Sequence, residues 1–224
     1  MKRLGIVGGL GPLASALFYE QLTRLTKAQA DQQHIELVLY SAPSIPDRSA
    51  FINGASDVSP LPGLLAACRV LEQLTDVIAI PCVTAHHFYD ELAGALALPL
   101  LDLHRICAAA VQPGATLGLL ATSGTIKSGR LQAILRENGI EPLLPRDQEA
   151  VTRLIYGIKA GQAPDVQGFR AVAAALAGSG AEMILLACTE LSLFQGAPDT
   201  PPLLAASELL ARHCIKIAGG TAID

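Results

Sequence analysis

Short apolar runs alternate with longer helical segments along the whole chain, and this alternation limits the fold more than any other feature of the sequence. The runs with the composition of buried strands are residues 4–7, 35–40, 77–80, 116–120 and 183–187. The clearest helical patterns are residues 12–27, 128–137 and 165–177. Strands that alternate with helices predict parallel sheets covered by helices, and therefore an α/β fold.

The sequence also contains a weak internal duplication. The first half begins with LGIVGGLGP and later contains VIAIPCVTA, whereas the second begins with TLGLLATSGT and later contains MILLACTEL. In each half, a strand that ends in a small-residue loop is followed by a strand that leads to Cys and then Thr. The separation is 77 positions from Gly5 to Cys82 and 70 positions from Gly118 to Cys188.

This duplication predicts two similar Rossmann-like lobes, each with a mainly parallel sheet flanked by helices and with the active site in the cleft between them. We expect residues 1–103 to form the first lobe and residues 104–205 the second. Residues 206–224 are expected to form a helix that packs back on the first lobe.

The composition argues against two classes of partner. The 224 residues are 51% hydrophobic and 16% charged, which is enough to bury a large core. The formal net charge is −4 and the basic residues are scattered, so we expect no binding of nucleic acid. The mean hydropathy is +0.42, but apolar runs such as residues 92–101 fall short of the roughly 18 residues of a membrane-spanning helix. We therefore expect no membrane segment.

The sequence predicts a cytoplasmic protein. The N-terminus resembles a signal peptide, with Lys2 and Arg3 followed by Ala-Ser-Ala at 14–16, but glycines and Pro12 interrupt its apolar segment. The five cysteines form neither a C-x-x-C pair nor a regular disulfide spacing. Both observations favour a reducing compartment.

Cys82 and Cys188 are the main candidates for catalysis. Each follows a predicted strand, and ligands bind at the carboxyl ends of strands in open α/β sheets. Two facing lobes would present one thiol to each face of a bound carbon, as the inversion of a stereocentre requires. A thiol has an ordinary pKa of about 8.5, so thiol and thiolate coexist near neutral pH when that pKa is lowered. Helical patterns begin at Thr84 and Thr189, and their dipoles are expected to favour the thiolates.

Removal of a Cα proton builds negative charge on the substrate carboxylate, and oriented donors must stabilise it. The candidate donors are the backbone amides of Gly8, Gly9, Leu10 and Gly11, the hydroxyls of Thr84, Thr125 and Thr189, and the cations Arg48 and Lys159. Arg48 lies in a loop stiffened by Pro43 and Pro46, which suits a carboxylate clamp.

Six segments resemble, in the same order, the aspartate racemase branch of the cofactor-independent aspartate/glutamate racemase superfamily: GIVGGLGPLAS, IPDR, PCVTAHHFYDEL, LLATSGTIKSG, IYGIKAG and LACTEL. The resemblance covers nearly the whole chain. It implies two α/β lobes around a cleft, no pyridoxal phosphate, no metal, a dicarboxylic amino acid as substrate and a homodimer. It also implies that Cys82 and Cys188 are the two acid/base thiols and that Arg48 and Lys159 bind the substrate carboxylates. Further residues on motif positions are Asp47, Thr84, Thr125, Thr189 and Glu190.

Three departures from the family pattern concern the substrate. Val83 stands where the family usually has Asn, and Val has no side-chain donor or acceptor. Loss of that hydrogen bond in a closed site costs about 1–3 kcal/mol. Ala205-Ala206-Ser207 replaces the usual Asp-Thr-Thr, and Ser192 stands where Pro is common.

Several other interpretations stay open for the sequence. A racemase with an altered substrate (glutamate, a broad range of amino acids or a hydantoin) and a non-catalytic carboxylate-binding relative both fit Val83. Cys82 and His86 have the spacing of two zinc ligands, but a structural zinc site needs four ligands and the sequence offers no partner cluster. A Cys/His hydrolase with His86 as base to a Cys82 nucleophile leaves the second cysteine motif unexplained. GGLGP lacks the spacing of a dinucleotide loop. Lys159 is either a substrate ligand, a Schiff-base lysine or a surface residue, and the remaining cysteines at 68, 107 and 214 are expected in the core or an interface.

Overall fold

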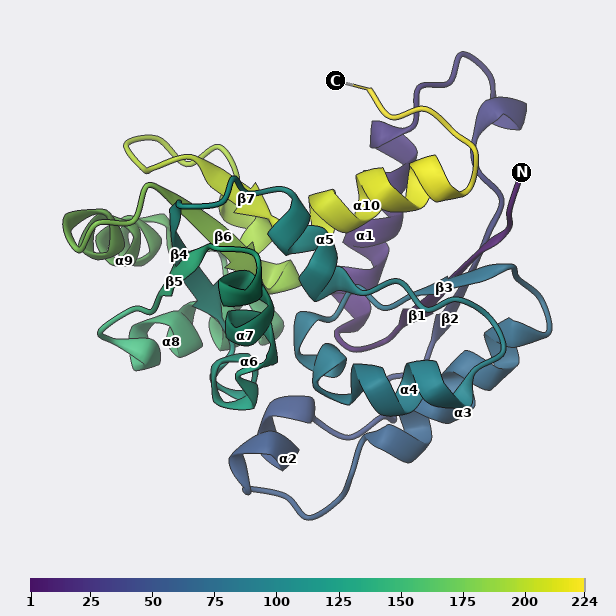
Figure 1. Ribbon diagram of the computed structural model, residues 1–224, viewed down its shortest axis with the longest axis horizontal. Helices are drawn as coiled ribbons and strands as arrows, with labels where there is room; N and C mark the ends of the chain where they lie inside the picture. Colours follow the sequence, from purple (N-terminus) through teal and green to yellow (C-terminus); the bar gives the residue numbers. More distant parts are fainter. Residues whose placement is uncertain (224) are drawn as a thin grey trace.

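Two parallel sheets, each flanked by helices, make up the computed structural model, which describes residues 1–223 (Figure 1). The first sheet has the order β2-β1-β3 and the second β5-β4-β6-β7. The strands are β1 (Leu4–Gly8), β2 (Leu37–Ser41), β3 (Val77–Ala79), β4 (Thr116–Ala121), β5 (Glu141–Leu143), β6 (Met183–Ala187) and β7 (Leu203–Ala205). All strand pairs in the two sheets are parallel. The predicted α/β class with two similar lobes is confirmed.

The two sheets repeat one arrangement. β1 lies between β2 and β3, and β4 lies between β5 and β6, so β3 and β6 occupy equivalent places. Cys82 follows β3 and Cys188 follows β6, each on the carboxyl side of its strand. The internal duplication of the sequence therefore corresponds to a repeat in the structure.

The helices are α1 (Pro12–Leu25), α2 (Arg48–Asn53), α3 (Leu61–Glu72), α4 (Tyr89–Ala95), α5 (Leu103–Ala109), α6 (Ser123–Ser128), α7 (Arg130–Glu137), α8 (Gln148–Lys159), α9 (Val166–Gly178) and α10 (Ala206–Ile217). Three 3₁₀ segments are η1 (Asp31–Gln33), η2 (Val83–Phe88) and η3 (Thr189–Phe194). α3 covers one face of the first sheet, and α9 packs against β6 of the second. Within the described residues, no helix has the length and apolar character to cross a membrane.

The structure differs from the sequence predictions in three places. β5 and β7 were not predicted, because each is only three residues long and β5 contains a proline, Pro142, that an edge strand tolerates. The helix predicted over residues 128–137 is broken at Gly129, whose φ of 72° ends α6 before α7 begins. Where helices were expected after both catalytic candidates, the chain forms the 3₁₀ segments η2 and η3, and only η2 continues into an α-helix, α4.

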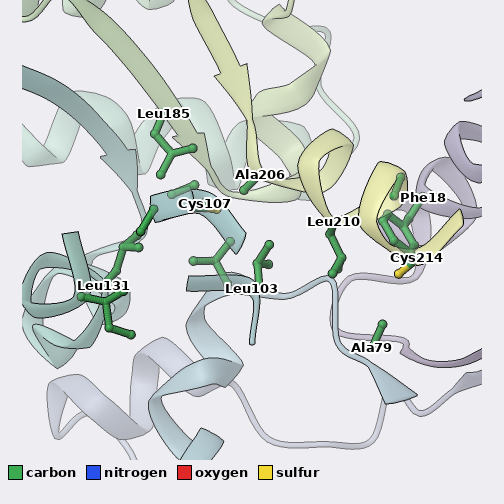
Figure 2. Packing of buried hydrophobic residues seen from close by; sticks show 14 of the residues in the cluster. Phe18, Ala79, Leu103, Cys107, Leu131, Leu185, Ala206, Leu210 and Cys214 are labelled. Atoms are coloured by element: carbon green, nitrogen blue, oxygen red, sulfur yellow. The ribbon is translucent and has the colours of Figure 1, made fainter. Parts of the chain in front are cut away.

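A shared apolar core joins the two lobes. It contains Leu4 and Ile6 of β1 together with Leu117 and Leu119 of β4, and all four side chains are fully buried. α10 packs against both α1 and α5 in the same region, and Figure 2 shows residues of this core from Phe18 of α1 to Leu185 of β6. Burial of this apolar surface, which contributes about 25 cal/mol per Å², holds the lobes in one orientation. The division of the chain near residues 103 and 205 stays a prediction.

A second contact between the lobes lies where α2 meets α6. Asn53 Nδ2 donates a hydrogen bond to Ser123 Oγ at 2.8 Å. Gly124 packs so closely against the other lobe that a Cβ atom there would lie 2.6 Å from Ser49 Cα. Because a backbone atom blocks that space, only glycine fits at this position without moving the lobes apart.

We expect Gly124→Ala to lower the free energy of unfolding by about 1–3 kcal/mol, the usual cost of overpacking. Urea unfolding followed by circular dichroism measures the change. Gly94→Ala is the matched control, since a Cβ at Gly94 of α4 meets no atom within 4 Å. This control should gain about 0.5–1 kcal/mol from the better helix propensity of Ala. Equal stability of Gly124→Ala and the parent would contradict the close contact.

Candidate active site

Cys82 and Cys188 line one cavity between the lobes, which we call the inner cavity. Cys82 is the N-cap of η2 and Cys188 is the N-cap of η3. The carbonyl of each cysteine accepts a hydrogen bond from the amide three residues later, from Ala85 and Leu191 respectively, at 3.1 Å in both cases. Equivalent turns in the two lobes therefore hold the two thiols.

The inner cavity contains most of the residues that the sequence singled out. Its lining is Leu10, Asp47, Arg48, Ser49, Cys82, Val83, Thr84, Thr122, Lys159, Ala187, Cys188, Thr189 and Glu190. Ser49, Thr122 and Ala187 were not predicted, although Thr122 follows β4 in the small-residue loop of the second repeat. Thr125 lies behind the lining, and Gly8 is outside it.

A second cavity of about 240 Å³, the outer cavity, adjoins the inner one. The two share Leu10, Asp47, Arg48, Lys159 and Glu190, so these residues lie at the boundary between the two cavities. The rest of the outer cavity is mainly apolar and is lined by Gly9, Gly11, Pro12, Leu13, Ala14, Leu17, Ile158 and Leu193. A larger cavity of about 740 Å³ between α1 and β2 contains neither thiol, so size alone does not identify the site.

The Cys188 thiol is hydrogen-bonded to a carboxylate. Its Sγ donates a hydrogen bond to Glu190 Oε2 at 3.0 Å, and Thr189 Oγ1 donates to the same oxygen at 3.0 Å. Burial and then the negative charge of Glu190 raise the pKa of Cys188 well above its ordinary value, although Lys159 opposes this shift. The expectation that a helix start lowers this pKa is wrong, because burial and the carboxylate outweigh a single 3₁₀ segment.

Lys159 stays a cation in this environment. Its Nζ lies 4.0 Å from Glu190 Oε1. Burial lowers the pKa of Lys159, but the electrostatic influence of the acidic groups around it, including Glu190, outweighs burial and raises the pKa overall. A Schiff-base lysine needs a neutral amine, so the geometry favours an electrostatic role for Lys159.

Arg48 is a buried cation without a carboxylate partner. Its side chain is 7% exposed, and its guanidinium donates to the carbonyls of Ile45, Pro46 and Leu10 at 3.4, 3.1 and 2.8 Å. Nε has no hydrogen-bond partner, and within residues 1–223 no acidic side chain forms an ion pair with Arg48. Such a group is suited to bind an anion that enters the cavity.

Two of the predicted site residues have structural partners instead. The Gly9 amide donates to Ser15 Oγ at 2.9 Å, so it is not free to bind a carboxylate. Gly9 itself is required by its φ of 84° and by Ala42, whose backbone nitrogen would lie 2.4 Å from an added Cβ. Asp47 caps α2 by accepting a hydrogen bond from the Ala50 amide at 2.7 Å.

Three threonines connect the lobes at the wall of the inner cavity. Thr84 Oγ1 lies 2.9 Å from both Thr122 Oγ1 and Thr125 Oγ1, and the latter two lie 3.0 Å apart. Thr122 also caps α6 by accepting from the Thr125 amide at 3.1 Å. Since Thr84 and Thr122 line the cavity, this triangle can orient a hydroxyl hydrogen toward a ligand.

His86 does not face Cys82 as a hydrolase base would. Its Nε2 lies 3.0 Å from the Ile80 carbonyl, and its Nδ1 has no hydrogen-bond partner. Burial lowers the pKa of His86 to about 4, so the ring is neutral at neutral pH. The structure therefore gives His86 a backbone partner rather than a catalytic one.

Comparisons with known proteins agree on one family. A profile described as Asp/Glu/Hydantoin racemase matches residues 7–213. The broad specificity amino-acid racemase RacX of Bacillus subtilis is 28% identical over 95% of this chain and 96% of that protein. The structure of an aspartate racemase from Picrophilus torridus superposes with a TM-score of 0.87 at 30% identity, covering 100% of this chain and 96% of that one. A glutamate racemase from Thermus thermophilus shares the fold, with a TM-score of 0.66 at 18% identity over 97% and 81% of the two chains.

We expect Glu190→Gln to lower the pKa of Cys188, because the variant removes the negative charge that opposes the thiolate and leaves Lys159 beside it. Iodoacetamide alkylation of Cys188, measured by peptide mass spectrometry across a pH series, should therefore reach half its maximal rate at lower pH. Glu182→Gln, a change at an exposed carboxylate outside the cavity, is the control. An unchanged alkylation profile in Glu190→Gln would show that burial alone sets the pKa.

Proposed function

The chain belongs to the Asp/Glu/hydantoin racemase family, and from that premise we propose that it is a PLP-independent amino-acid racemase with Cys82 and Cys188 as its two acid/base groups. The observation that carries this proposal is that both thiols line the inner cavity from equivalent positions of the two lobes. A single base would exchange a Cα proton on one face only, whereas inversion needs a proton donor on the opposite face as well.

The protonation of Cys188 suggests the direction of one half-reaction. Cys188 is held as a thiol by burial and by its hydrogen bond to Glu190. We infer that Cys82, as a thiolate, removes the Cα proton of one enantiomer and that Cys188 delivers its proton to the opposite face. The product complex then has a Cys82 thiol and a Cys188 thiolate, which is the starting form for the reverse reaction.

The cations of the cavity supply charge stabilisation in this proposal. Arg48 has an unpartnered Nε and no counter-ion, so it is our candidate for binding the α-carboxylate, on which negative charge grows as the Cα proton leaves. Lys159 lies beside Glu190 and offsets the charge that Cys188 acquires when it gives up its proton. Both effects are stronger than in bulk water because Arg48 and Glu190 are buried.

Aspartate is the substrate that we propose first. The motif resemblance and the superposition with an aspartate racemase both support it. Two cations, Arg48 and Lys159, line both cavities and match the two carboxylates of aspartate in number.

A broad-specificity racemase is the second candidate, and the outer cavity favours it. Lys159 already has Glu190 as a partner, so Arg48 is the one lining cation within the described residues that lacks a carboxylate. The outer wall is mainly leucine and other apolar side chains, including Leu13, Leu17 and Leu193, which suit a neutral substrate side chain. Val83 also lacks the amide that the family usually presents.

We also propose a homodimer in a reducing cytoplasm. The homodimer follows only from the sequence resemblance. The reducing compartment is supported by the cysteines at 68, 82, 107, 188 and 214, all of which are free thiols in the structure.

Incubation with L-aspartate in D₂O tests the proposed chemistry. We expect deuterium at Cα together with the appearance of D-aspartate, measured by NMR and chiral chromatography. Cys82→Ala and Cys188→Ala should each lower the rate of racemisation by about 10²–10⁴-fold, because each removes one acid/base group. Either variant is expected to retain proton exchange on a single enantiomer.

Cys68→Ala is the control for these variants, because Cys68 is buried in the first lobe away from both cavities. It should racemise at the parental rate in protein that remains folded. Racemisation at the parental rate by either Cys82→Ala or Cys188→Ala would overturn the two-base assignment. Binding of aspartate without any exchange would instead support a non-catalytic carboxylate-binding protein.

A substrate panel separates the two candidates. If aspartate is the substrate, its kcat/KM should exceed that of methionine by at least about 10-fold, since an unpaired carboxylate-binding cation costs more than about 1.4 kcal/mol. L-glutamate and a 5-substituted hydantoin complete the panel. A methionine value equal to or above that of aspartate would transfer the assignment to the broad-specificity racemase.

A further inference from the structure

Two histidines hold the backbone on both sides of Cys82. His86 Nε2 lies 3.0 Å from the Ile80 carbonyl and His104 Nε2 lies 3.1 Å from the Val83 carbonyl. Since a carbonyl only accepts hydrogen bonds, each Nε2 carries the hydrogen and donates it. The two carbonyls flank Pro81-Cys82, so the segment that carries the thiol is fixed at both ends.

The orientation of His104 depends on Arg130. Arg130 Nη1 donates to His104 Nδ1 at 3.2 Å, which requires Nδ1 to be the unprotonated nitrogen. The same guanidinium makes a two-pronged contact with Asp102, at 3.1 and 2.8 Å. Asp102 in turn caps α5 by accepting from the His104 amide at 3.0 Å. A continuous chain of hydrogen bonds thus runs from Asp102 through Arg130 and His104 to Val83.

This series of hydrogen bonds crosses from one repeat of the fold to the other. Arg130 begins α7 beside the second sheet, whereas η2 follows β3 of the first sheet. The Tyr89 ring lies under the guanidinium, with its centroid 4.6 Å from the Arg130 central carbon. The Arg130 side chain is only 16% exposed, which makes its pairing with Asp102 less screened than a surface pair.

Both rings are uncharged donors at neutral pH. His86 and His104 are each 1% exposed. Burial lowers the pKa of His104 to about 3, assisted by His86 and Arg130, while burial lowers that of His86 to about 4. The charged groups that face the pair are Asp102 and Arg130, which compensate each other.

We propose that His86, His104 and Arg130 are positioning residues for Cys82, acting through the Ile80 and Val83 carbonyls to aim the thiol at one face of Cα. The two thiols are then held by different means, since Cys188 has a side-chain partner in Glu190, whereas among the described residues no hydrogen bond fixes the Cys82 sulfur. This inference rests on the proposed two-base racemisation. None of the three residues lines either cavity, so none contacts the substrate.

The test compares the two thiols separately. In a Cys188→Ala background, Cα deuterium exchange depends on Cys82, and in a Cys82→Ala background it depends on Cys188. We expect His104→Leu to lower the Cys82-dependent rate by about 10–100-fold, the usual effect of a misplaced catalytic group, and to leave the Cys188-dependent rate within about twofold. His104→Gln keeps an amide donor near the Nε2 position and should restore most of the lost rate.

A merely structural role would give a different pattern. Equal losses in both backgrounds, or no loss in folded His104→Leu, would overturn the proposal, as would a failure of His104→Gln to exceed His104→Leu. If circular dichroism shows that His104→Leu does not fold, Arg130→Gln replaces it, because this change leaves the His104 ring in place and removes its fixed partner. The same selective loss in the Cys82-dependent rate is then expected.

A chemical measurement separates this proposal from the proposed function. His104→Leu should release the Pro81-Cys82 segment and so raise the rate of Cys82 alkylation by iodoacetamide at least about threefold. The alkylation rate of Cys188 should stay unchanged, whether or not the protein is a racemase. Selective alkylation without Cα exchange in the parent would uphold the positioning role and reject racemisation. Suppose instead that the parent exchanges the Cα proton and that the variants change neither Cys82 alkylation nor exchange. This result would uphold racemisation and reject the positioning role.

Discussion

Burial of one apolar core between two parallel sheets fixes the geometry on which the candidate site depends. Leu4 and Ile6 of β1 and Leu117 and Leu119 of β4 belong to that core, together with residues of α1, α5 and α10. The carboxyl ends of β3 and β6 then meet at a single cavity. A shift of either sheet would separate the thiols, and the close contact of Gly124 with Ser49 opposes such a shift.

The two repeats share a backbone arrangement but differ in their electrostatics. Cys188 is buried beside Glu190 and Lys159, whereas Cys82 is half-buried and is held through backbone carbonyls by neutral histidines. Such a difference gives a pair of one thiol and one thiolate a preferred proton distribution, which two equivalent thiols would lack. The two repeats therefore place the two thiols at equivalent positions, and the side chains that differ between the repeats give the thiols different electrostatic surroundings.

The sequence predicts those parts of the molecule that local patterns determine. Apolar runs located β1, β4 and β6 closely, and the repeated strand-Cys-Thr pattern brought out Cys82 and Cys188 as a pair. Thr122 and Ser49 were missed, because their place in the cavity depends on contacts between segments far apart in the chain. The raised pKa of Cys188 was also missed, since burial and a hydrogen bond between its thiol and the side chain of Glu190 are properties of the packed state.

Val83 affects both the packing around Cys82 and the hydrogen-bonding groups that line the inner cavity. Its side chain is 3% exposed and packs in the shared core, while its carbonyl accepts the hydrogen bond of His104. An asparagine at this position would have to present its amide to the cavity or bury it without a partner, whereas valine contributes apolar packing that reinforces the fixed backbone. Compared with the family pattern, this position thus has apolar packing beside Cys82 in place of a side-chain donor. In the proposed racemase, recognition of the substrate then depends more heavily on the buried Arg48, whose Nε has no partner, and on the apolar part of the outer cavity wall.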